Sequence, residues 1–103
     1  MAWVIFSAAP DLKTARRLAR RLVKKKLAAC VTCVPGGSSV YRWKGRIESA
    51  KETLLMVKTS KRRLKEAFRI LRQRHPYDLP EVIALRVAAG SKEYLDWIEK
   101  SVK

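Results

Sequence analysis

The sequence has few acidic residues for its size. Nine Asp and Glu accompany twenty-four Lys and Arg, so the formal net charge is +15 over 103 residues. It has one histidine and none of the motifs G-x-x-x-x-G-K, G-x-S-x-G or H-E-x-x-H, which mark phosphate-binding loops, hydrolase nucleophiles and zinc proteases. No stretch approaches the roughly 20 apolar residues that cross a membrane. We therefore expect one domain, residues 1–103, that is not an enzyme and has no membrane span.

The N-terminus lacks the basic residues that open a signal peptide, and its apolar residues begin at once. This pattern is typical of a first strand rather than of a targeting segment. We expect a cytoplasmic protein.

Only two cysteines are present, Cys30 and Cys33. The spacing C-x-x-C occurs in redox and zinc sites, but a redox motif needs it at the start of a helix. Here it lies in an apolar stretch that is typical of a strand, where residues three apart point to opposite faces. We favour two small buried thiols over a metal or redox pair.

Apolar periodicity and turn residues predict the order of elements along the chain. We expect a strand at 3–8, a helix opened by Pro10 and Asp11, and a strand at 27–34 that resumes at 40–45. A turn-like polar segment at 46–52 and a strand at 53–58 follow. The remaining elements are a helix capped by Thr59 or Ser60 and ending near His75, a strand at 81–88, and a helix from Ser91 to Val102.

Pro35, Gly36 and Gly37 interrupt the central apolar stretch. Proline removes a backbone donor and glycine permits positive φ, so the interruption is either a bulge inside one long strand or a turn between two.

The order β-α-β-β-α-β followed by a helix predicts an α+β fold, a ferredoxin-like sandwich with an added C-terminal helix. In this arrangement both crossover helices cover the same face of one antiparallel sheet. The strands, however, are apolar on both faces. A monomer would expose a large apolar surface, so the sequence predicts self-association.

Several motifs occur in order along nearly the whole chain: Leu27-Ala-Ala-Cys-Val31, Pro35-Gly36, Ser39-x-Tyr41-x-Trp43-x-Gly45, Lys58-Thr59, His75-Pro-Tyr77-x-x-Pro80-Glu81 and Tyr94-Leu-x-Trp97. With them the sequence resembles the CutA family of divalent-ion tolerance proteins. The resemblance implies a homotrimer of ferredoxin-like subunits and a non-enzymatic role in tolerance of copper and other divalent cations. The alternative that it suggests is a PII-like signalling trimer, which would bind a small anion or nucleotide in clefts between subunits.

The resemblance also implies a candidate metal site. The copper ligand proposed for a bacterial member is a cysteine in the first strand, whose counterpart here is Ser7, and a hydroxyl is a poorer ligand for a soft metal. That site also uses paired histidines, of which this chain keeps only His75. We take His75 with Glu81 as candidate ligands for Cu(II) or another divalent cation, and expect no required cofactor. The alternative is a histidine that ends a helix and bonds a carbonyl or a partner subunit.

Aromatic residues with a polar group are common at subunit interfaces. The candidates for a trimer interface or an inter-subunit cleft are Tyr41, Trp43, Tyr77, Tyr94 and Trp97. For Trp43 and Trp97 we favour packing over ligand binding.

Both predicted crossover helices carry basic residues on their solvent sides. Nonspecific binding of polyanions is one interpretation, and a solvated basic face is the other. Few aromatic residues lie among these positive charges, which argues against stacking of single-stranded bases.

Overall fold

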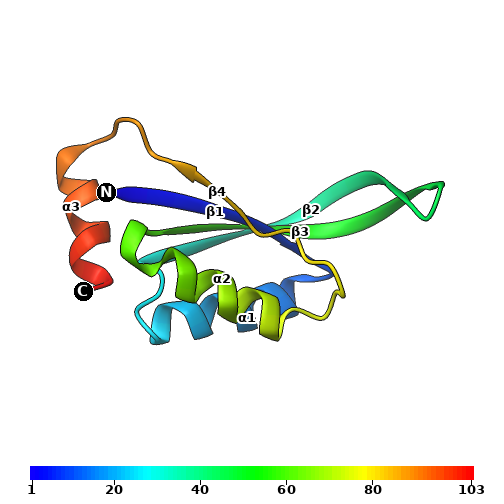
Figure 1. Cartoon of the computed structure of the whole chain (residues 1–103), viewed down its shortest axis with the longest axis horizontal. Helices are drawn as coiled ribbons and strands as arrows, with labels where there is room; N and C mark the ends of the chain where they lie inside the picture. Colours follow the sequence, from blue (N-terminus) through cyan, green and yellow to red (C-terminus); the bar gives the residue numbers. More distant parts are fainter.

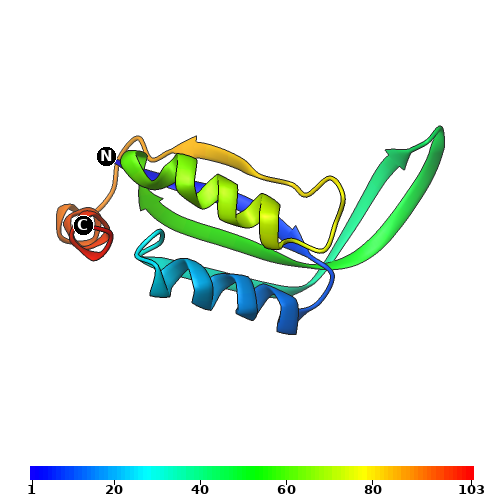
Figure 2. The same cartoon turned by 60° about the horizontal axis from the view of Figure 1, so that its bottom comes forward.

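The computed structural model describes all residues, 1–103. Its elements are β1 (Ala2–Ala9), α1 (Leu12–Lys24), β2 (Cys30–Trp43), β3 (Arg46–Ser60), a short 3-10 helix η1 (Lys61–Arg63), α2 (Leu64–Arg74), β4 (Ile83–Arg86) and α3 (Lys92–Ser101). The sheet order is β2-β3-β1-β4, and every neighbouring pair is antiparallel. Helices α1 and α2 lie side by side over one face, and α3 lies at the end of the sheet near the N-terminus (Figures 1 and 2). The predicted ferredoxin-like arrangement is confirmed.

The hydrophobic core lies between the sheet and these two helices. Ile5 of β1 and its partner Val57 of β3 face the helices, and Leu18 and Leu22 of α1 pack against that side. Twelve buried residues form the cluster. Because side chains alternate along a strand, the residues between these positions point to the opposite face.

That opposite face is apolar and uncovered in the single chain. Its side chains come from every strand: Val4, Phe6, Val34, Leu54, Met56, Ile83 and Leu85. Ile83 and Leu85 remain 54% and 57% exposed. The prediction that the strands are apolar on both faces is confirmed, and one of these faces has no cover.

Helix α1 begins as the sequence predicts. The Asp11 carboxylate accepts a hydrogen bond of 2.7 Å from the Thr14 amide, which satisfies one of the free amides of the first turn. This bond lowers the pKa of Asp11 below its usual value.

The predicted cap of the second helix is confirmed in position but not in bonding, because Ser60 is the N-cap of η1, which continues directly into α2. Thr59 and Ser60 are the last residues of β3, and Ser60 makes no side-chain cap bond. The Thr59 hydroxyl instead donates a 2.7 Å bond to the Leu27 carbonyl, while Ser60 pairs with Ala2. The predicted end of the helix is confirmed, because α2 stops at Arg74, two residues before a proline that disfavours helical geometry in its neighbour.

The interruption at residues 35–37 is a bulge within one strand. Pairing with β3 shifts between Val34, opposite Leu54, and Gly37, opposite Glu52. Gly36 has φ of +85°, which glycine adopts without strain. Strand β2 starts at Cys30 rather than at Leu27, because the residues before it complete the turn out of α1.

The prediction of a turn at residues 46–52 is wrong. These residues form the first half of β3 and pair with residues 37–43 of β2. Lys44 and Gly45 connect the strands with φ of 49° and 77°, as in a tight type I′ hairpin turn. This arm extends away from the helices (Figure 1), so its polar residues reflect exposure on both faces rather than a turn.

Strand β4 is shorter than the predicted 81–88. Ladder pairing with β1 covers Ile83–Arg86, and one further bond joins the Val87 amide to the Ala2 carbonyl. The strand lies at the edge of the sheet, where only one neighbour is available for pairing.

Candidate functional site

His75 follows the last residue of α2 and is 7% exposed. Its Nε2 lies 2.7 Å from the Ala8 carbonyl oxygen, which can only accept, so Nε2 carries the ring proton. Its Nδ1 accepts a 3.1 Å bond from the Tyr77 amide. Both ring nitrogens are therefore engaged within the chain, and the side chain fastens the end of α2 to β1.

Tyr77 continues this network toward β3. Its hydroxyl donates a 2.9 Å bond to the Glu52 carboxylate, and its ring lies 4.6 Å from the His75 ring, centroid to centroid. Burial, with added contributions from the bond to Glu52 and its charge, raises the pKa of Tyr77 to about 12. The phenol therefore stays protonated and holds the loop after α2 against the base of the arm.

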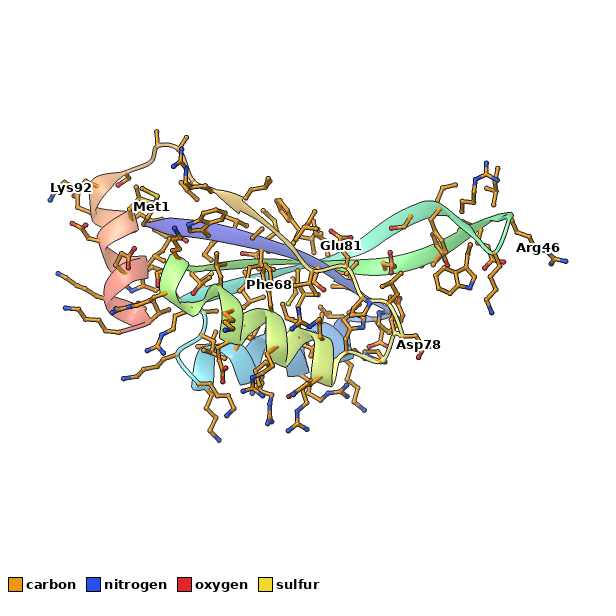
Figure 3. The ribbon with its side chains drawn as sticks, in the orientation of Figure 1. Met1, Arg46, Phe68, Asp78, Glu81 and Lys92 are labelled. Carbon is orange, nitrogen blue, oxygen red and sulfur yellow. The ribbon has the colours of Figure 1, made fainter.

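Glu81 lies between α2 and β4 (Figure 3) and is exposed. It takes part in none of the three ion pairs of the chain. No group of three or more His, Cys, Asp or Glu side chains is close enough to hold a metal ion. Metal binding by His75 and Glu81 stays a prediction, and it requires the metal to displace one of the two bonds to the His75 ring.

Ser7, which the resemblance sets against a copper-binding cysteine, lies in β1. It is 0% exposed, and its Oγ has no hydrogen-bond partner. Alternation along β1 places it on the same side as Ile5 and Ala9, under the helices. The sequence contained a signal for this unusual position, because Ser7 interrupts an apolar strand.

The five predicted interface aromatics lie in separate places. Tyr41 and Trp43 are on the arm, Tyr77 is in the loop after α2, and Tyr94 and Trp97 are on α3, at the opposite end of the molecule from the arm (Figure 1). Tyr94 and Trp97 contact each other with ring centroids 5.5 Å apart. Except for Tyr77, each is between 42% and 45% exposed. One chain alone does not bring them into a common cleft.

The two cysteines lie on opposite faces of β2, as the spacing predicts. Cys33 pairs with Leu55 and packs against the core, where burial raises the pKa of its thiol. Cys30 pairs with Lys58 on the uncovered face, with its Sγ 3.9 Å from the ammonium nitrogen. Both are partly buried in the single chain, so the expectation of buried thiols is wrong for one chain, because β2 is an edge strand.

Sequence reasoning missed two features of the structure. Glu52 is the partner of Tyr77, although neither its spacing nor its type points to that contact. A surface depression of about 630 Å³ lies between Met1, the end of β3 and Glu99 of α3, and none of the predicted site residues lines it. A polar contact between residues far apart in the sequence has no local signal.

Comparisons with known proteins agree on one family. The family model described as CutA1 divalent ion tolerance protein matches residues 3–101. The divalent-cation tolerance protein CutA of Thermus thermophilus is 43% identical over 98% of this chain and 98% of its own. The crystal structure of CutA from Xylella fastidiosa has a TM-score of 0.97 at 45% identity, covering 99% and 98% of the two chains.

A third relative bears on location. The Archaeoglobus fulgidus protein described as periplasmic divalent cation tolerance protein CutA has a TM-score of 0.96 at 40% identity, with full coverage of both chains. In the present chain no helix is long and apolar enough to cross a membrane. The cytoplasmic location expected from the sequence stays a prediction.

Proposed function

Because the chain belongs to the CutA1 family of divalent ion tolerance proteins, we propose that it acts in tolerance of copper and related divalent cations as a homotrimer with no reaction of its own. The observation that carries the assembly is the uncovered apolar face of the sheet. Exposed apolar patches of this kind mark interaction surfaces in soluble proteins. The chain supplies no second layer for that face, so another copy is the partner that we propose.

The arm supports the same assembly. A two-stranded ribbon is marginally stable by itself in water, yet residues 37–43 and 46–52 pair along their whole length. Val40 and Ile47 of this ribbon are 71% and 72% exposed. Packing against neighbouring subunits would bury these side chains and bring the arm aromatics to other chains.

The native mass tests the assembly. The chain has a mass of 11.8 kDa, so we expect about 35 kDa by light scattering after size exclusion, as a closed ring of three predicts. Ile83→Asp with Leu85→Asp places two carboxylates on the uncovered face and should give a monomer. Val23→Asp is the control, because Val23 is 44% exposed on α1, outside that face. A native monomer, or a double variant of native mass, would refute the trimer.

We also propose that metal contact occurs at subunit borders through His75 and Glu81. Copper(II) titration of tryptophan fluorescence, with zinc in parallel, tests this for the native chain, His75→Ala and Glu81→Gln. Glu81 is exposed, so its variant retains the fold even if loss of the buried histidine does not. Asp78→Asn is the matched control, since it removes an exposed carboxylate from the same loop.

Saturable quenching that is lost in both site variants and kept in the control supports the metal site. Coincident curves for the native chain and Glu81→Gln exclude Glu81 as a ligand, and coincident curves for a folded His75→Ala exclude His75.

Tolerance itself is tested by growth in raised copper or zinc of a bacterial strain without its own family member. Expression of this chain should restore growth, and failure to do so would contradict the proposed function.

A further inference from the structure

The positive charge of the chain is concentrated in one layer. We define the basic layer as residues 12–26 and 61–74, which contain α1, η1 and α2. It holds fifteen of the twenty-four Lys and Arg and one of the nine acidic residues, Glu66. The layer therefore has a net charge of +14 out of +15, and the rest of the chain is nearly neutral. Solubility alone would not require this separation.

Most of these charges are free to meet a partner. Thirteen of the fifteen basic side chains are exposed, and many project from α1 and α2 on the side away from the sheet (Figure 3). The one acidic residue, Glu66, is paired with Arg69. No other ion pair of the chain involves the layer. The positive electrostatic field of the layer is thus almost unopposed by acidic side chains, and it attracts polyanions.

The other side chains of the layer narrow the class of polyanion. Val23 is its only exposed large apolar residue, and it has no exposed aromatic residue. Membrane-surface helices need an apolar face to insert, and single-stranded nucleic acid needs aromatic side chains for stacking. Among the uncharged polar side chains of the layer only Gln73 is exposed, so the layer offers almost nothing but positive charge, as in binding to a phosphate backbone.

We propose that the basic layer binds the phosphate backbone of double-stranded DNA without reading its sequence. Helix α1 has 13 residues and is about 20 Å long at 1.5 Å per residue. A duplex carries one charge per about 1.7 Å, so this footprint spans about twelve phosphates. With about half of them facing the layer, some six contacts are available, and arginine suits them because its guanidinium bonds phosphate with two donors.

The layer remains accessible in the proposed trimer. It covers the face of the sheet opposite to the apolar face through which we propose that subunits meet. The three basic layers of the trimer would therefore face outward, and each could contact DNA. The inference does not depend on the metal role, and a failure of either one leaves the other intact.

Fluorescence anisotropy of a labelled 24-base-pair duplex, titrated with the full chain between 50 and 300 mM salt, tests the proposal. With about six phosphate contacts, the logarithm of the affinity should fall with the logarithm of the salt concentration with a slope of about −5. Lys24→Gln with Lys65→Gln removes two charges from the layer. Lys100→Gln with Lys103→Gln removes two exposed lysines elsewhere and is the matched control.

We expect the layer variant to have a slope shallower by about 1.8 and an affinity about 60-fold lower at 0.1 M salt, because each phosphate contact accounts for about 0.9 of the slope. The control should bind like the native chain. Equal losses in both variants, or none in the layer variant, would overturn the proposal. Tighter binding to a single strand of equal length, to duplex RNA, or to phosphatidylserine vesicles would also overturn it, in favour of that partner.

Discussion

Replacing Ser7 with alanine should stabilise the protein, although it removes a polar group from a strand. Ser7 is fully buried and its hydroxyl has no partner. An unsatisfied buried polar group costs about 1–3 kcal/mol. The void that replaces one oxygen atom costs less than about 0.5 kcal/mol. We therefore expect Ser7→Ala to raise the free energy of unfolding by about 1 kcal/mol per subunit, or about 4–8 °C in Tm for a domain of this size.

Guanidinium denaturation followed by circular dichroism, at one fixed subunit concentration, measures this change as a higher midpoint with an unchanged slope. Ser38→Ala is the matched control, because it makes the same substitution on the exposed part of β2 and should change stability by less than about 0.5 kcal/mol. If Ser7→Ala is less stable than the native protein by more than the control, the hydroxyl has a bonding partner in solution and the reasoning is refuted.

Three further predictions concern single bonds and one backbone angle. The pKa of Asp11 is depressed because its carboxylate accepts a bond from the Thr14 amide. The stabilising effect of this carboxylate is therefore present above about pH 4 and lost as the pH falls through the depressed pKa. Asp11→Asn keeps the cap, so the stability advantage of the native protein over this variant should shrink as the pH falls in acid denaturation. The pKa of Tyr77 is raised to about 12 in the folded protein and is about 10 in the unfolded chain. The stability advantage of the native protein over Tyr77→Phe, measured by urea denaturation, should therefore be constant below pH 10 and shrink toward pH 12. A constant difference would contradict both the burial of the Tyr77 hydroxyl and its bond to Glu52, the two main causes of the raised pKa. Gly36→Ala should lower the free energy of unfolding by about 1–2 kcal/mol because φ is +85°, and an unchanged denaturation midpoint would argue against the bulge.

Local sequence determined the order of elements and most helix ends. Asp11 caps α1 and Pro76 stops α2 through contacts within a few residues, so their positions could be predicted from residue type alone. Strands that are apolar on both faces could also be predicted from the sequence, because alternation along a strand assigns each side chain to one face. Cys30 and Cys33 fall on opposite faces of β2 for the same reason.

Only the tertiary structure decided what the polar residues do. Residues 46–52 look like a turn locally, and they form a strand because residues 37–43 offer them a ladder of backbone bonds. His75 could be a metal ligand by sequence, yet Ala8, distant by 67 positions, and the Tyr77 amide occupy its ring nitrogens. The sequence shows that basic residues are abundant, but folding places α1 and α2 side by side and turns two separate charged segments into one surface. Such outcomes depend on which distant segments pair, and no local pattern encodes that.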